Sequence, residues 1–374
     1  MSDHPLLFWT QADEAHSARW RAENGMAPPG KVWLADDRLT ADQAFRLACE
    51  GTALLWQGDF HNARQLLQAM ARRIDRKPRK TSDLPAEAFH LHRQAQAHRA
   101  RTLAMLLVPL AADYSIPLRR APDAKQACLE AYGPAEADSV VSLRELQGLI
   151  GAHEWRKKGV DIPELGGRIH PHHGVFSPNR GEYIGLVAQA PLPSLELAFD
   201  IGTGSGVLAG VLAKRGVKRI VATDQDERAL ACARDNLTRL GLISRVDLLN
   251  ADLFPAGRAP LVVCNPPWVP ARPSSPIEYA VYDPDSRMLL GFLNGLAAHL
   301  TPGGEGWLIL SDLAEHLGLR TRAELLSAIE AAGLRVKDRL DIRPRHPRAS
   351  DEKDPLHLAR AAEITSLWRL TAAD

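Results

Sequence analysis

A glycine-rich turn at residues 200–206 (Asp-Ile-Gly-Thr-Gly-Ser-Gly) constrains the fold of this chain more than any other feature. It follows an apolar run at residues 195–201 and leads into an apolar helical pattern at residues 207–215. The glycines allow a tight turn and let the backbone approach a ligand at the carboxyl edge of an open α/β sheet. Because Val207 stands where the dinucleotide fingerprint has its third glycine, the pattern is GxGxG. We therefore expect a nucleotide-like cofactor here; the alternative is a turn without a ligand.

The rest of the second half alternates between strand and helix patterns. Further short apolar runs predict strands, and amphipathic stretches predict helices at residues 228–240 and 322–332. This alternation indicates a parallel, doubly wound sheet with right-handed crossovers. The expected fold class is α/β with a seven-stranded Rossmann-like sheet, and the spacing of the last two strands permits an antiparallel hairpin. Its strands are expected at residues 195–201, 219–223, 246–249, 261–264, 307–310, 334–340 and 364–370.

The first half of the chain has a helical pattern. Apolar residues recur every three or four positions over residues 40–73, where Thr40 is a candidate N-cap, and again over residues 87–108, 122–132 and 143–158. We therefore expect a mostly helical N-terminal domain for substrate recognition at residues 1–160. Residues 161–190 are expected to connect the domains and cover the cofactor, and residues 191–374 to form the catalytic domain.

Composition excludes several classes of protein. The 374 residues carry a net charge of +1, which argues against a surface built wholly for polyanions. Four dispersed cysteines without a CxxC pair indicate neither a disulfide framework nor a cysteine-based zinc site, and fit a reducing, cytoplasmic compartment. No apolar run approaches ~18 residues, so we expect no membrane span.

Two carboxylates follow the second and third predicted strands. Asp224 stands at a strand end, where its oxygens can accept hydrogen bonds from both hydroxyls of a ribose. Asp252 can accept a hydrogen bond from an adenine amino group. The alternatives are a solvated strand-end aspartate for Asp224 and a helix cap or turn residue for Asp252.

The tetrapeptide Asn265-Pro266-Pro267-Trp268 follows the fourth predicted strand. The prolines restrict the backbone, so the Asn265 amide and the Pro266 carbonyl would be held rigidly beside the cofactor. Two such acceptors can grip the hydrogens of an NH₂ group whose lone pair is delocalised, and favour the geometry that frees it for attack. Trp268 offers a flat face on which a planar group can stack. The alternative is an ordinary turn after a strand.

These motifs, in this order, resemble those of the class I S-adenosylmethionine-dependent methyltransferases. The resemblance covers roughly residues 174–370 and implies that the glycine turn approaches the methionine end of the cofactor, Asp224 its ribose and Asp252 its adenine. S-adenosyl-L-methionine is then the expected cofactor. The candidate cofactor-binding residues are Asp200, Gly202, Thr203, Gly204, Gly206, Asp224, Asp252 and Asn265, and the candidate catalytic residues are Asn265, Pro266, Pro267 and Trp268.

Two further segments resemble the release-factor glutamine N5-methyltransferases. They are Phe-Ser-Pro-Asn-Arg-Gly-Glu at residues 176–182 and the stretch from Asp283-Pro284 to residue 296. The second departs from the family pattern, with Asp283 in place of Glu, Phe292 in place of Gly and Asn294 in place of Asp. Ribosomal RNA guanine methyltransferases of the small-domain group also join an extended N-terminal region to an NPP domain. Candidate substrate-side residues are Arg180, Glu182 and Tyr282.

We therefore expect an N-methyltransferase that acts on a planar amide or amino nitrogen, above all a protein glutamine side chain. The alternatives are amino methylation of adenine or guanine in ribosomal RNA or DNA, and a nucleotide-binding module or dehydrogenase that does not transfer methyl groups. The expected partner is a macromolecule, either protein or RNA, and not a membrane. The sequence does not predict the oligomeric state.

Other clusters carry less weight. His170, His172 and His173 have a spacing that could suit a metal, but neither an acid nor a cysteine accompanies them, so we expect a solvated linker and no metal. Cys264 is expected to be a buried, inert thiol. The basic run at residues 71–80 is expected to be a solvated loop, with contact to phosphate or to an acidic protein surface as the alternative. A second basic loop at residues 343–348 lies near the predicted sheet edge, where it could flank the substrate entrance.

Overall fold

The computed structural model describes residues 4–76, 80, 82–178, 181–273, 276–344 and 354–373. The chain divides into two compact units. The first unit comprises Met1–Thr81 and His90–Glu154, and the second comprises Ser82–Phe89 and Trp155–Asp374. Two helices, α3 (Pro85–Ala104) and α5 (Leu143–Lys158), contribute residues to both units. The boundary between Glu154 and Trp155 lies a few residues before the expected domain boundary at residue 160.

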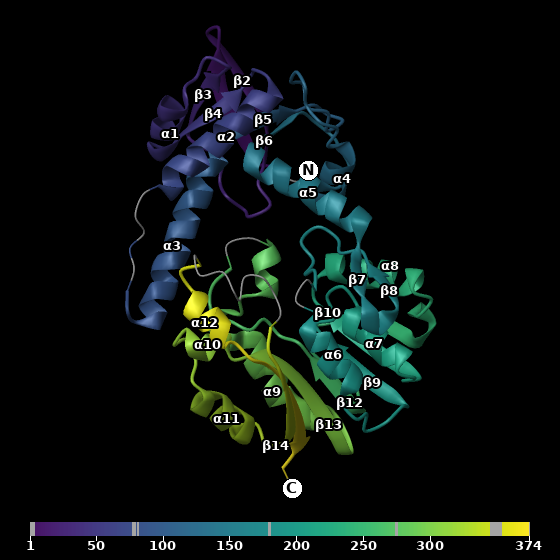
Figure 1. Ribbon diagram of the computed structural model, residues 1–374. Coiled ribbons are helices and arrows are strands. Elements are labelled where there is room, and N and C mark those ends of the chain that lie inside the picture. The colour runs from purple at the N-terminus through teal and green to yellow at the C-terminus, as the bar shows by residue number, and fades with distance from the viewer. Residues whose placement is uncertain are drawn as a thin grey trace. The chain divides into compact units, whose positions relative to one another are not determined.

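The first unit contains a mixed sheet with helices beside it (Figure 1). Its strands β3, β4 and β5 pair in parallel, whereas β1 with β2 and β5 with β6 pair antiparallel. Across the described residues the order is β1-β2-β6-β5-β4-β3. The strands are β1 Leu6–Gln11, β2 Glu14–Arg21, β3 Lys31–Ala35, β4 Thr52–Trp56, β5 Leu106–Leu110 and β6 Ser139–Ser142, and the helices wholly within the unit are α1 Ala41–Cys49, α2 Phe60–Asp75 and α4 Lys125–Tyr132.

The prediction of a mostly helical N-terminal domain was therefore wrong. The helices at residues 40–73 exist, and Thr40 forms the capping box at the start of α1, but β4 lies between them. Likewise β5 follows directly after α3, where the sequence pattern predicted one helix up to residue 108. Both strands are short and mostly apolar, and four of the five residues in each are buried. Hydrophobic periodicity alone cannot distinguish such a run from a buried stretch of helix.

The second unit contains the sheet that the sequence predicted. Over the described residues its order is β11-β10-β9-β12-β13-β15-β14, parallel except for β15, which pairs antiparallel with both neighbours. The strands are β9 Leu197–Ile201, β10 Arg219–Asp224, β11 Val246–Asn250, β12 Ala259–Cys264, β13 Leu300–Ser311, β14 Leu334–Ile342 and β15 Thr365–Ala372. All seven expected strands, including the antiparallel final pair, are confirmed.

Helices cover both faces of this sheet (Figure 1). Successive strand residues point to opposite faces, so Val263 of β12 packs in the core beneath α6 and α7, and Val262 in the core beneath α9 and α11. The helices are α6 Glu182–Gln189, α7 Val207–Lys214, α8 Glu227–Arg239, α9 Arg287–His299, α10 Leu313–His316, α11 Arg322–Ala331 and α12 His357–Ala362. Short elements complete the unit: β7 Val160–Ile162, β8 Gly167–Ile169, and the 3₁₀ turns η1 Pro163–Leu165, η2 Ile243–Arg245, η3 Pro276–Ala280 and η4 Pro284–Ser286.

The strand order creates one switch point. From β9 the chain first builds the sheet outward through β10 and β11, and then returns to place β12 on the other side of β9. The carboxyl ends of β9 and β12 therefore border the crevice in which open α/β sheets bind ligands. Within the described ranges, no helix is long and apolar enough to cross a membrane.

Candidate active site

The glycine turn joins β9 to α7 and needs its glycines. Gly202, Gly204 and Gly206 have φ angles of 71°, 54° and 80°, in the left-handed region that side chains disfavour. A Cβ atom at Gly202 would also collide with the end of the Met288 side chain, and one at Gly206 would lie 3.1 Å from the Ala233 Cα. No atom lies within 4 Å of a Cβ built at Gly204, so the backbone there is free to approach a ligand.

Asp200 holds the turn from inside the protein. Its carboxylate, in a side chain only 1% exposed, accepts hydrogen bonds from the Thr203 hydroxyl at 2.7 Å and from the Ala209 amide at 3.1 Å. Burial raises the pKa of Asp200 to about 6; the Asp224 carboxylate adds to the rise, and the two hydrogen bonds oppose it. Asp200 therefore supports the loop and does not line the cavity beside it, although the sequence predicted a cofactor contact.

We expect Asp200→Asn to change how stability depends on pH. An aspartate in an unfolded chain has a pKa of about 3.9. As the pH rises, the Asp200 carboxyl therefore ionises at a lower pH in the unfolded state than in the native state. Relative to Asp200→Asn, the wild-type protein should lose stability as the pH rises from about 4 towards 6, and the difference should then level off. Urea unfolding of both proteins across this range measures the effect. A difference that does not vary with pH would contradict the assignment.

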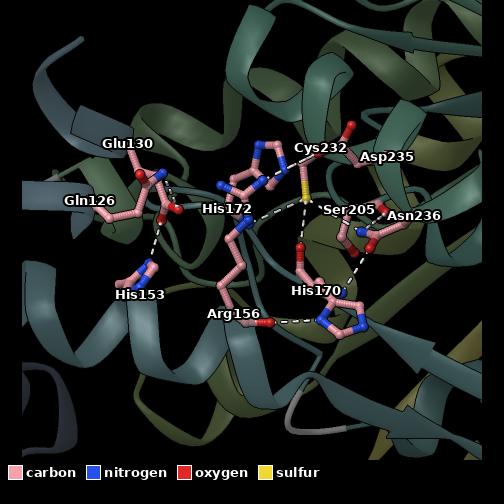
Figure 2. A network of polar contacts seen from close by, with 10 residues as sticks. All are labelled: Gln126, Glu130, His153, Arg156, His170, His172, Ser205, Cys232, Asp235 and Asn236. Carbon is pink, nitrogen blue, oxygen red and sulfur yellow. Dashed lines mark hydrogen bonds and ion pairs between the residues drawn. The ribbon is translucent and has the colours of Figure 1, made fainter. Parts of the chain in front are cut away.

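A network of polar contacts links the glycine turn and the connector to α8 (Figure 2). The buried Asn236 side chain of α8 donates to the Ser205 carbonyl at 3.0 Å and accepts from the His170 backbone amide at 2.7 Å. The His170 ring contacts the Arg156 carbonyl, and His172 contacts Asp235. The expectation of a solvated histidine linker was therefore wrong for these two residues, which tie the connector to α8. Sequence reasoning missed Asn236, because a single asparagine within an amphipathic helix carries no sequence signal.

Asp224 ends β10 directly beside the turn. Its carboxylate accepts hydrogen bonds from the backbone amides of Gly204 at 3.0 Å and Asp226 at 3.0 Å. Burial raises its pKa, and these backbone hydrogen bonds oppose the rise. Asp252, which follows β11, is exposed and forms an ion pair with Arg287 at 2.5 Å. Sequence reasoning missed Arg287, since nothing in the chain pattern shows that the start of α9 meets the end of β11.

A cavity of about 220 Å³ connects these residues with the tetrapeptide at the end of β12. Gly202, Thr203 and Gly204 contribute to its wall, together with Asp224 and Asp252. The connector also lines it, through residues 174–176; that this segment covers the cofactor stays a prediction. Asn265 and Pro267 complete the lining on the β12 side. The predicted chemical group and the glycine turn therefore face the same open volume.

The residues of the tetrapeptide differ in whether they line the cavity. Asn265 is partly exposed and lines the cavity, whereas Pro266 is buried and does not. The indole N–H of Trp268 donates to the Asn265 side-chain oxygen at 2.8 Å. Trp268 does not belong to the cavity wall; its ring packs edge-on against Tyr183, with the ring centroids 6.4 Å apart. Its predicted stacking on a substrate remains a prediction.

Of the substrate-side candidates, Glu182 and Tyr282 do not line this cavity. Glu182, at the start of α6, lines a second cavity of about 700 Å³, and its neighbour Tyr183 lines the first instead. Tyr282 pairs with Val269 and packs against Phe89. Arg180 lies outside the described residues. Tyr183 was missed because the segment resemblance identified a stretch of chain but not which side of α6 faces the cavity.

The structure also describes the Cys264 thiol, the possible metal ligands and part of the two basic runs. Cys264 is completely buried, as expected, and burial raises its pKa well above the ordinary value, which favours an inert thiol. Among the described residues, no three His, Cys, Asp or Glu side chains are arranged to hold a metal ion. In the first basic run, Arg73 pairs with Asp42 at 2.6 Å. The basic positions 77, 79, 345, 346 and 348 of the two runs lie outside the described residues.

Known proteins resemble the part of the chain that carries this site. The family model described as Ribosomal protein L11 methyltransferase (PrmA) matches residues 190–266. A release factor glutamine methyltransferase of Cereibacter sphaeroides is 31% identical over 169 residues, which cover 41% of this chain and 58% of that protein. A ribosomal protein L11 methyltransferase of Pelotomaculum thermopropionicum is 35% identical over 144 residues, 38% of this chain and 39% of that protein. The chain thus spans about half the length of the curated relatives it matches.

Among solved structures, a methyltransferase from Pyrococcus furiosus aligns over 55% of this chain and 90% of its own, with 20% identity and a TM-score of 0.40. Four findings point to the same class of protein: the strand order, the glycine turn, the strand-end carboxylates and the sequence relatives. The second unit is a class I S-adenosylmethionine-dependent methyltransferase domain.

Proposed function

We propose that this protein transfers a methyl group from S-adenosylmethionine to the side-chain nitrogen of a glutamine in another protein. One observation carries the proposal: Asn265 and the glycine turn line the same cavity. An acceptor nitrogen held by Asn265 would therefore face the place where the cofactor belongs. The first unit is, in this proposal, the part that recognises the substrate.

The residues around the glycine turn fit the cofactor. Asp224 offers carboxylate oxygens to ribose hydroxyls, and Asp252 lines the same cavity, where an adenine amino group can donate to it. The open side of Gly204 admits a ligand close to the backbone. When bound, S-adenosylmethionine supplies a methyl group that an electron pair can attack.

The chain's own contribution to the chemistry is positioning. An amide nitrogen shares its lone pair with the carbonyl and is a poor nucleophile. The Asn265 side-chain oxygen would accept a hydrogen of the NH₂ group and favour the geometry in which the lone pair points at the methyl group. Pro266, whose carbonyl the sequence predicts as a second acceptor, does not line the cavity. No dedicated base is required, because the nitrogen becomes strongly acidic once methylated and can release its proton to water.

Similarity favours glutamine over a nucleobase amine. The relatives reported above are named for protein substrates, a release factor and ribosomal protein L11. Other release factor glutamine methyltransferases, such as that of Mycobacterium tuberculosis, are similarly close, with 36% identity over 157 residues. The net charge of +1 also provides no general attraction for nucleic acid.

The experiment uses tritiated S-adenosylmethionine and the purified full chain in a cell extract, divided between protease and ribonuclease treatment. The proposal expects label that protease releases and ribonuclease leaves intact, and mass spectrometry of the labelled protein should find N-methylglutamine. Label released by ribonuclease would instead establish a base amine as the acceptor. No incorporation above that in extract without the added protein would contradict methyl transfer itself.

A further inference from the structure

We propose that Trp268 is a positioning residue that fixes which end of the Asn265 carboxamide faces the acceptor, with Tyr183 holding the indole in place. This inference rests on the proposed function, because it concerns how Asn265 acts on the acceptor nitrogen. It assigns Trp268 a role other than stacking on the substrate.

The carboxamide of an asparagine has two ends of nearly equal shape but opposite character. Its oxygen accepts hydrogen bonds, whereas its NH₂ group only donates them. A half turn of the Asn265 side chain would therefore place a donor where the acceptor must be, and the NH₂ group of a substrate would meet another NH₂ group. The reaction requires a neighbour that distinguishes the two ends.

Trp268 is such a neighbour. Its indole N–H donates to the Asn265 Oδ1 at 2.8 Å, and an indole nitrogen can only donate. If the carboxamide turned over, two donors would face each other in a partly buried site, which costs the hydrogen bond and leaves both groups unsatisfied. An amide oxygen has two lone pairs, so one remains for the acceptor when the other receives the indole N–H.

Packing keeps the indole in this position. The ring of Tyr183, a residue only 2% exposed, meets it edge-on with an interplanar angle of 89°. Trp268 also packs partly against the hydrophobic cores on both faces of the sheet. Because the indole is absent from the cavity wall that Asn265 and Pro267 help to form, the geometry favours positioning over stacking. Phenylalanine at this position would keep the packing but offer no N–H.

The test is a double-mutant cycle of Trp268→Phe and Asn265→Asp, with turnover of the glutamine-containing acceptor as the readout. A carboxylate carries an oxygen at both ends, so it needs no neighbour to orient it. We expect Trp268→Phe to lower kcat by ~10-fold or more in the Asn265 background, as a misplaced catalytic group does, but to have little effect in the Asn265→Asp background. The Kd for S-adenosylhomocysteine should hardly change. A substrate-stacking role would instead give similar losses in both backgrounds, and would overturn the proposal.

A spectroscopic measurement separates this inference from the proposed function. In ¹⁵N-labelled protein, the indole N–H signal that disappears in Trp268→Phe should exchange slowly with solvent in the wild-type protein and faster in Asn265→Ala. Rapid exchange in the wild type would overturn the positioning role even if methyl transfer were established. Slow exchange that Asn265→Ala abolishes would support the hydrogen bond even if the acceptor were a nucleobase.

Discussion

Replacing Asn265 by alanine should lower kcat by ~10²–10³-fold, the loss typical when one preorganised polar contact to a reacting group is removed. The Kd for S-adenosylhomocysteine should remain nearly unchanged. Asn265 lines the cavity next to the glycine turn, yet its contact with the acceptor nitrogen becomes fully effective only as that nitrogen changes geometry. The loss should therefore appear in turnover and not in cofactor binding. Tritium transfer under saturating cofactor measures kcat, and calorimetry measures the affinity.

Asn294→Ala is the matched control for this variant. Asn294 is exposed on α9 and does not line the cavity, so its loss should leave kcat and cofactor affinity unchanged. Thermal unfolding of both variants separates lost chemistry from lost folding. Unchanged turnover in a folded Asn265→Ala variant would show that the β12 tetrapeptide is only a turn.

Asp224→Ala should weaken S-adenosylhomocysteine binding by about 100-fold or more, since a hydrogen bond to a charged group contributes ~1.5–3 kcal/mol and two ribose hydroxyls depend on this carboxylate. The variant also removes the acceptor for the Gly204 amide. Because the ionised carboxylate is the form that accepts hydroxyl hydrogens, and burial raises its pKa, affinity for the wild-type protein should fall as the pH is lowered through the Asp224 titration. Calorimetry across pH measures both effects.

Asp247→Ala serves as the control for the charge change. Asp247 lies on β11, pairs with Arg219 at 2.8 Å, and does not line the cavity. The Asp247→Ala variant should bind S-adenosylhomocysteine with the same affinity as the wild-type protein. Equal affinities for Asp224→Ala and Asp247→Ala would mean that the strand-end aspartate is merely solvated, which is the alternative that the sequence leaves open.

The second unit could be predicted from sequence because its local signals agree with one another. Most of its buried strands are separated from the neighbouring helices by glycine or polar residues, and the glycine turn at 202–206 marks where β9 ends. In the first unit, only Met105 separates α3 from β5, so the leucines of β5 fitted a helical period equally well. Gly51 and Gly58 flank β4, but its two leucines fitted the same helical period.

The residues of the site also fall into those that the sequence could predict and those that it could not. Asp224 and Asn265 could be located because each follows a strand, and parallel strands bring their carboxyl ends to one edge. Tyr183, Asn236 and Arg287 could not, because they reach the site from helices whose orientation depends on packing across the whole sheet. The direction of the Trp268 indole N–H is likewise a product of packing against α6, and no motif encodes it.

A crystal structure with S-adenosylhomocysteine tests the central claim most directly. We predict the ribose at Asp224, and the sulfur and the Asn265 carboxamide facing one open volume with no side chain between them. A ligand bound elsewhere, or a sulfur walled off from Asn265, would contradict the account.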